Sequence, residues 1–165
     1  MKRNDFIKGL GIGALTSPYF LNHITADPKL PLDKQLVQDF VGLSHRDKDK
    51  VMAMLEEHPT LLNSAHDWGM GDFETALGAA SHVGYKELVL HLVEKGAQTD
   101  IFTACLFGRM DIVKPILDLF PKTLHAKGPH GFTLLHHAIQ GGDEALEVKS
   151  YLESLGAVEM KVPLY

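Results

Sequence analysis

Apolar residues recur at helical spacing along most of this chain and predict short helices arranged in pairs. The positions that set the pattern in the first pair are Leu36, Val37, Phe40, Val41, Val51, Met52 and Leu55. The polar stretch 44–47 separates the two helices, and Pro59 ends the second because proline cannot continue a helix. Residues 32–62 therefore predict one helical hairpin.

The same order of helix, break and helix follows three more times, at residues 75–97, 100–124 and 133–157. Asp100 stands where its side chain can cap the next helix. Pro115 lies in the second helix of the third unit. We expect it in the first turn of that helix, where the missing backbone N–H makes no difference.

The units also match one another at constant spacing. Asp49 and Pro59 correspond to Asp111 and Pro121, and both pairs are 62 positions apart. The stretch 75–84 corresponds to 133–142 at a spacing of 58. Both spacings are close to twice a repeat of about 33 residues. The sequence therefore predicts about four repeats of one structural unit.

The segment Thr133-Leu134-Leu135-His136-His137-Ala138 resembles the Thr-Pro-Leu-His-x-Ala signature of ankyrin repeats. The resemblance implies an all-α fold, an ankyrin-repeat solenoid of about four helix-turn-helix repeats with short hairpin fingers. This domain would cover residues 32–157, with a C-terminal tail at 158–165. The resemblance also implies that His136 forms a hydrogen bond between neighbouring loops, whereas we expect His137 to be solvated or to line a groove.

In the ankyrin family a concave surface formed by first helices and fingers binds protein partners. This resemblance implies a protein or peptide partner at the Gly-rich finger 67–74, which contains the only tryptophan. Aromatic residues carry much of the energy of protein contacts, and the acidic residues of the finger suggest a partner with basic groups. The candidate partner-binding residues are Trp68, Met70, Asp72, Phe73, Glu74, His82, His130 and Phe132. The alternative is that Trp68 and Phe73 fold back onto the neighbouring repeat.

Composition excludes some other roles. The net charge of −5 does not indicate a basic face and argues against nucleic-acid binding. The single cysteine, Cys105, cannot form an internal disulfide and is expected to be a small buried residue. We expect a monomer.

Ten histidines raise the question of metal chemistry. The residues that could approach one another around the two fingers are His66, Asp67, Asp72, Glu74, His82 and His130. No spacing among them is typical of a metal site, and no nucleophile–base–orienter set is recognisable. We therefore predict no metal, no cofactor, no catalytic residue and no enzymatic activity. The alternative function is a small metal-dependent hydrolase that uses this His/Asp/Glu cluster.

Residues 1–26 have the composition of a leader. Lys2, Arg3 and Lys8 precede a weakly apolar run at 9–15, which is too short to span a bilayer but suits a signal segment. Residues 3–8 resemble the twin-arginine export pattern of bacteria, with Asn4 in place of the second arginine. The leader favours export to the periplasm, and the alternative is a cytoplasmic protein. We expect no stable membrane span.

Overall fold

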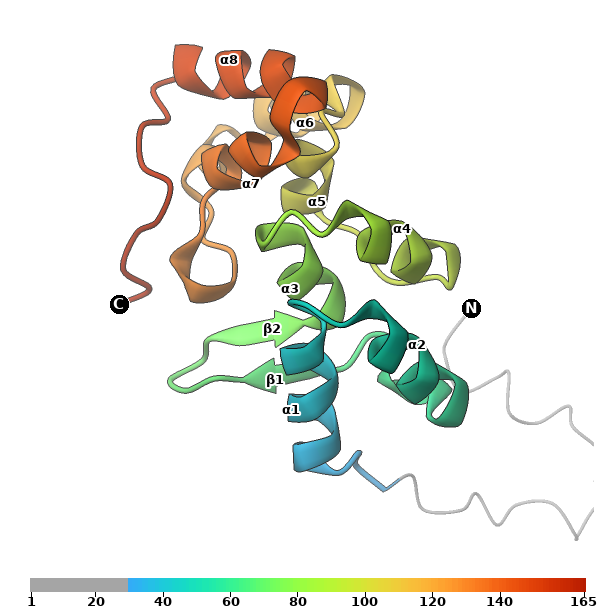
Figure 1. Cartoon of the computed structure of the whole chain (residues 1–165). Coiled ribbons are helices and arrows are strands. Elements are labelled where there is room, and N and C mark those ends of the chain that lie inside the picture. The colour runs from blue at the N-terminus through green and yellow to red at the C-terminus, as the bar shows by residue number, and fades with distance from the viewer. Residues whose placement is uncertain (1–29) are drawn as a thin grey trace, which may run out of the picture. The chain divides into compact units, whose positions relative to one another are not determined.

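The computed structural model describes residues 30–165, and the predicted leader at 1–26 lies outside them. Helices dominate this part of the chain, as predicted (Figure 1). The α-helices are α1 (Lys34–Leu43), α2 (Lys48–Glu57), α3 (Ala76–His82), α4 (Lys86–Glu94), α5 (Ile101–Leu106), α6 (Met110–Leu119), α7 (Leu134–Gly141) and α8 (Leu146–Ser154). Short 3-10 turns are η2 (Pro59–Leu61), η3 (Pro121–His125), η4 (Pro129–Gly131) and η5 (Gly142–Ala145). Two strands, β1 (Ala65–Asp67) and β2 (Phe73–Thr75), form an antiparallel hairpin.

Side-chain caps fix the starts of several helices. Each capping oxygen accepts a hydrogen bond from a backbone N–H of the first turn, which otherwise has no partner within the helix. The capping residues are Asp33, Asp47, Thr75, Asp100 and Thr133. The prediction that Asp100 caps a helix is therefore confirmed, and α3 and α7 begin in the same way after their threonines.

The first helices of the pairs adjoin one another in chain order. Helix α1 contacts α3, α3 contacts α5, and α5 contacts α7, while each second helix follows its own first helix (Figure 1). Buried apolar side chains form two clusters, one mainly among α1 to α4 and the other among α5 to α8. This order of contacts places the residues that precede α3 and α7 on the same side of the row of first helices.

Those residues form two fingers. The first finger, residues 67–74, is the outer part of the hairpin of β1 and β2, in which His66 lies opposite Glu74 and Asp67 opposite Phe73. Since side chains alternate along a strand, Glu74 points to the buried side while Phe73 is exposed. The second finger, residues 128–132, contains η4 and pairs with the C-terminal tail. Its Gly131 carbonyl accepts a hydrogen bond from the Val162 N–H at 2.9 Å.

The position of Pro115 differs from the prediction. It is the sixth residue of α6 rather than part of the first turn, so the helix lacks the hydrogen bond that an N–H at this position would donate to the Asp111 carbonyl. Pro115 lies on the exposed face, while Val113 and Leu117 face the core. The unpaired carbonyl therefore lies on the side of the helix that water can reach.

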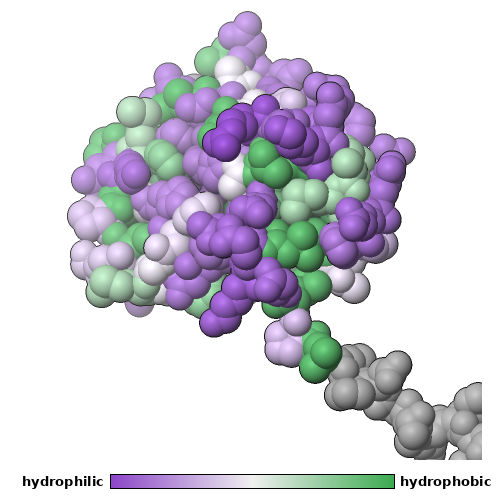
Figure 2. Space-filling view, turned by 60° about the horizontal axis from the view of Figure 1, so that its bottom comes forward, coloured by the Kyte–Doolittle hydropathy of each residue, from purple (hydrophilic) through white to green (hydrophobic). Residues whose placement is uncertain are grey.

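Polar residues dominate the face of the molecule in Figure 2, and a group of apolar residues lies among them. Within residues 30–165, no helix combines the length and apolar character needed to cross a bilayer.

Candidate functional site

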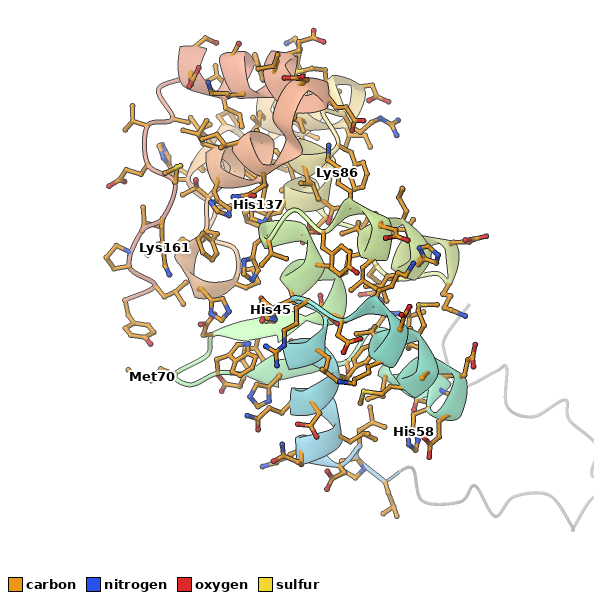
Figure 3. All side chains as sticks on the ribbon, in the orientation of Figure 1. His45, His58, Met70, Lys86, His137 and Lys161 are labelled. Atoms are coloured by element: carbon orange, nitrogen blue, oxygen red, sulfur yellow. The ribbon has the colours of Figure 1, made fainter. Side chains whose placement is uncertain are left out.

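The structure brings six of the eight predicted partner-binding residues together at the base of the two fingers and turns the other two outward. The six residues are Trp68, Asp72, Glu74, His82, His130 and Phe132. Met70 and Phe73 are 80% and 62% exposed. Met70 lies at the tip of the hairpin, and the labelled His45 lies near its base (Figure 3).

The carboxylate of Glu74 is the centre of this group. Glu74 is only 1% exposed, and its Oε2 accepts a hydrogen bond from the indole N–H of Trp68 at 2.7 Å. Burial by itself disfavours the charged carboxylate, but the adjacent imidazoles of His82 and His45 and the indole of Trp68 outweigh burial and lower the pKa of Glu74. Glu74 is therefore a buried carboxylate held in its charged form.

Three imidazole nitrogens surround this carboxylate. His82 Nε2 lies 2.9 Å from Glu74 Oε1, and His45 Nε2 and His130 Nε2 lie 3.6 Å and 3.4 Å from Oε2. The Nε2 atoms of His45 and His82 are 3.0 Å apart. We call these four residues, His45, Glu74, His82 and His130, the histidine–glutamate cluster.

The cluster joins three of the four units. His45 follows α1 in the first unit, Glu74 and His82 belong to the second unit, and His130 lies in the second finger. His130 adopts a left-handed backbone conformation with φ 58°, which few residues other than glycine adopt. Asp72 of the first finger holds this conformation, because its carboxylate accepts hydrogen bonds from both the backbone N–H and Nδ1 of His130.

His82 is fixed from two further sides. The Phe132 ring stacks on its imidazole at 4.8 Å, and His136 Nε2 donates a hydrogen bond to its backbone carbonyl at 2.8 Å. His136 thus links two units through a hydrogen bond, but the acceptor is the last residue of α3 in the second unit and not a neighbouring loop as predicted. Burial lowers the pKa of His136, which favours the neutral ring with its proton on Nε2.

His137 contradicts the expectation that it is solvated or lines a groove. It is 1% exposed, packs against Phe102 and donates a hydrogen bond from Nδ1 to the Thr133 carbonyl at 2.8 Å. The reason is that α7 is covered by α5 on one side and by α8 on another, so that little of its surface reaches solvent. Burial lowers the pKa of His137 to about 4.

His45 was not among the candidates from the sequence. One signal could have found it: the dipeptide Ser44-His45 recurs as Ser81-His82, 37 positions later, and both dipeptides lie at the C-terminal end of the first helix of a unit. The two histidines are therefore equivalent residues of adjacent units, which explains why their rings meet.

Cys105 takes no part in this site. It is fully buried in α5, and burial raises the pKa of its thiol to about 12, so that it stays protonated at neutral pH. The prediction that it is a small buried residue is confirmed.

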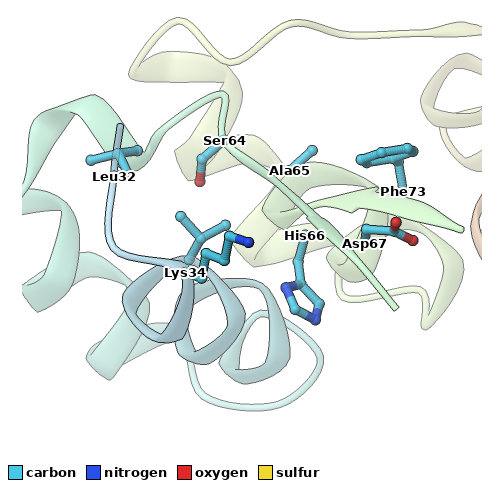
Figure 4. A pocket seen from close by; sticks show the side chains of 8 residues that line it. Leu32, Lys34, Ser64, Ala65, His66, Asp67 and Phe73 are labelled. Carbon is cyan, nitrogen blue, oxygen red and sulfur yellow. The ribbon is translucent and has the colours of Figure 1, made fainter. Parts of the chain in front are cut away.

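An open groove of about 520 Å³ runs beside the exposed face of the first finger (Figure 4). It lies between the start of α1 and the strand β1. Its lining residues are Leu32, Lys34, Val37, Ser64, Ala65, His66, Asp67 and Phe73. Apolar side chains thus line part of a recess next to the Phe73 ring.

No protein-family model matches this chain, and no curated protein is significantly similar to it in sequence. The resemblance to ankyrin repeats therefore depends on the segment 133–138 and on the spacing of the repeated units.

Proposed function

We propose that residues 32–157 form an ankyrin-type solenoid that binds a protein or peptide and catalyses no reaction. Two features support the repeat architecture: the signature-like segment 133–138, and the consecutive contacts of α1, α3, α5 and α7. In the ankyrin family, first helices and fingers form the binding surface. The described fingers lie along the same row of first helices.

The observation that carries the proposal is the contrast between the tip of the first finger and its base. Met70 and Phe73 are exposed, although burying such side chains is favourable. The base is fixed by the bond from Trp68 to Glu74 and by the bonds from His130 to Asp72. An apolar tip on a fixed base is preorganised, because a partner does not have to order the loop on binding.

The proposed contact is mainly apolar. Asp72 and Glu74, the acidic residues that suggested a basic partner, form hydrogen bonds inside the site and do not point to solvent. Phe73 stands beside the groove of Figure 4, where Leu32 and Val37 offer further apolar surface. We therefore propose a partner that places an apolar side chain against Phe73 and into this groove.

The test is capture of a partner from an extract of the native host by the full chain, followed by affinity measurement with the purified partner. Met70→Ser with Phe73→Ser is the test variant. Leu119→Ser is the matched control, since Leu119 is also exposed but lies at the end of α6. We expect the double variant to lose the partner while its melting temperature is unchanged, and the control to bind as the wild type does. Equal affinity of the partner for the wild type, the double variant and the control variant would contradict the proposal.

A further inference from the structure

We propose that the histidine–glutamate cluster binds one divalent first-row transition-metal ion, for which Zn²⁺ is the reference, through His45 Nε2, His82 Nε2, His130 Nε2 and a carboxylate oxygen of Glu74. The proposal of this site does not rest on the proposed partner binding. The absence of a typical ligand spacing in the sequence does not argue against it, because the four ligands come from three different units.

The ligand atoms already have the separations that an ion requires. Zn²⁺ takes imidazole nitrogen and carboxylate oxygen at about 2.0–2.2 Å, which places the corners of a tetrahedral site about 3.3 Å apart. The separations among these atoms include 2.9, 3.0, 3.4 and 3.6 Å. All four ligand atoms lie within 4.8 Å of one another. A single ion can therefore contact all four groups with small side-chain movements.

Two of the three rings, those of His45 and His130, are also oriented as metal ligands are. A metal-bound histidine usually donates its other ring N–H to a carboxylate or a backbone carbonyl, which fixes the ring and leaves a lone pair for the ion. His130 Nδ1 lies 2.7 Å from the carboxylate of Asp72, and His45 Nδ1 lies 3.2 Å from the Gly42 carbonyl. Since both partners can only accept, the proton of each ring is on Nδ1. The Nε2 lone pairs then face Glu74.

This orientation leaves the metal-free cluster short of protons. With neutral His45 and His130, their Nε2 atoms offer no donor to Glu74, and the single N–H of His82 Nε2 lies near two acceptors, His45 Nε2 and Glu74 Oε1. That one N–H cannot serve both acceptors. Buried Glu74 Oε1 has no hydrogen-bond partner among residues 30–165. An unpaired buried carboxylate oxygen costs free energy, and a cation among these lone pairs would remove that cost.

The donor set indicates the class of ion. Three imidazoles and one carboxylate suit zinc and its neighbours in the first transition row, whereas Ca²⁺ and Mg²⁺ prefer oxygen ligands. An ion can enter from the side of His45 and His130, whose side chains are 23% and 25% exposed. Glu74 closes the opposite side.

Four protein ligands define the role of the site. A structural zinc site has four protein ligands, whereas a catalytic one keeps a position open for water. The ion would connect the first unit, the second unit and the second finger, and so would hold the base of both fingers. The proposal therefore assigns the cluster a structural role and disagrees with the alternative of a metal-dependent hydrolase.

The experiment uses the full chain without a polyhistidine tag, stripped of metal with a chelator that is then removed. Zn²⁺ binding is measured by calorimetry, and Co²⁺ is titrated as a spectroscopic probe of coordination geometry. We expect one ion per chain and a visible Co²⁺ spectrum of a four-coordinate site. His45→Gln and His82→Gln should each weaken Zn²⁺ binding at least about a hundredfold, since even residues behind the ligands contribute about 10- to 100-fold. His125→Gln, at an exposed histidine outside the cluster, should bind like the wild type.

Circular dichroism of the metal-free variants separates loss of ligands from loss of fold. If a variant is unfolded, X-ray absorption of the Zn²⁺-loaded wild type decides, and the expected first shell contains imidazole nitrogen with one carboxylate. Absence of stoichiometric Zn²⁺ binding by the folded wild type would overturn the proposal. Zn²⁺ affinity equal to that of the wild type in the folded His45→Gln and His82→Gln variants would also overturn it. So would a first shell of water oxygens around the Zn²⁺ ion.

Discussion

The carboxylate of Asp72 ties the first finger to the second, because it accepts two hydrogen bonds from His130, a residue 58 positions away. The backbone N–H of His130 donates to Oδ1 at 2.8 Å and the ring Nδ1 to Oδ2 at 2.7 Å. Asp72 is partly buried, which disfavours its charge, but these two hydrogen bonds from His130 outweigh burial and lower the pKa of its carboxyl. One side chain thus fixes both the strained backbone of His130 and the direction of its ring.

We predict that Asp72→Asn destabilises the metal-free protein by about 1–3 kcal/mol, the usual loss when a buried hydrogen-bonded group loses its charged partner. Urea unfolding in the presence of a chelator measures this effect. Asp67→Asn is the control, since within residues 30–165 the Asp67 carboxylate accepts hydrogen bonds only from Gly69 and Gly71 of its own turn. Equal stability of the Asp72 variant and wild type would mean that the fingers are not coupled.

Trp68→Phe should also destabilise the protein. The ring of Trp68 is 38% exposed, but its indole N–H is a donor to the buried Glu74 carboxylate, and phenylalanine removes that donor while keeping an aromatic ring. Loss of the donor is expected to cost about 1–3 kcal/mol. Phe73→Ala, on the exposed side of the same hairpin, should cost less than about 1 kcal/mol. Urea unfolding of both variants measures the difference. A larger loss of stability for Phe73→Ala than for Trp68→Phe would mean that the Phe73 side of the hairpin is the buried one.

The helices and both fingers were predictable because they depend on local signals. Apolar spacing, Asp100 as a cap and the polar break at 44–47 all act within a few residues. The burial of Glu74 was not predictable in this way. An acidic residue in a Gly-rich loop normally points to water, and here it is buried only because histidines from the first unit and the second finger meet over it.

The errors at His137 and Pro115 have a related cause. Helical periodicity assigns one buried face to a helix, but α7 is covered on more than one side, so that a residue beside the predicted core face is buried as well. Conversely, Pro115 is tolerated well inside α6 because its side of the helix faces solvent. Both outcomes depend on which neighbours pack where, and the sequence of one helix does not contain that information.

Gly108→Ala should be far more disruptive than Gly96→Ala. Both glycines have a positive φ, 61° and 94°, which costs a side-chain-bearing residue about 1–2 kcal/mol. A Cβ at Gly108 would also collide with the backbone carbonyl of Glu144, whereas a Cβ at Gly96 would meet no described atom within 4 Å beyond the adjacent residues. We expect a loss of more than about 3 kcal/mol, or failure to fold, for Gly108→Ala only. Thermal unfolding measures the stability of both variants. Similar losses of stability would mean that backbone strain alone, and not the collision with Glu144, determines the effect.

Stability should fall between neutral and mildly acidic pH because of His137. Its pKa is about 4 in the folded protein and 6.5 as an unperturbed side chain, so the unfolded chain binds a proton in this window while the folded chain does not. Stability is therefore complete above pH 6.5 and decreases as pH falls toward 4, by up to about 3 kcal/mol from this residue. From about pH 7 to about pH 5, the expected contribution is about 2 kcal/mol.

His137→Leu isolates this contribution from that of the other titrating groups, because leucine has a similar size and no proton to bind. Urea unfolding at both pH values, with a chelator present, should give a loss that is about 2 kcal/mol smaller in the variant than in the wild type. His125→Gln, which changes an exposed histidine, should leave the wild-type loss unaltered. If the wild type and His137→Leu lose the same free energy of unfolding, His137 binds its proton as easily in the folded protein as in the unfolded chain, and its burial by α5 and α8 is looser than the structure indicates.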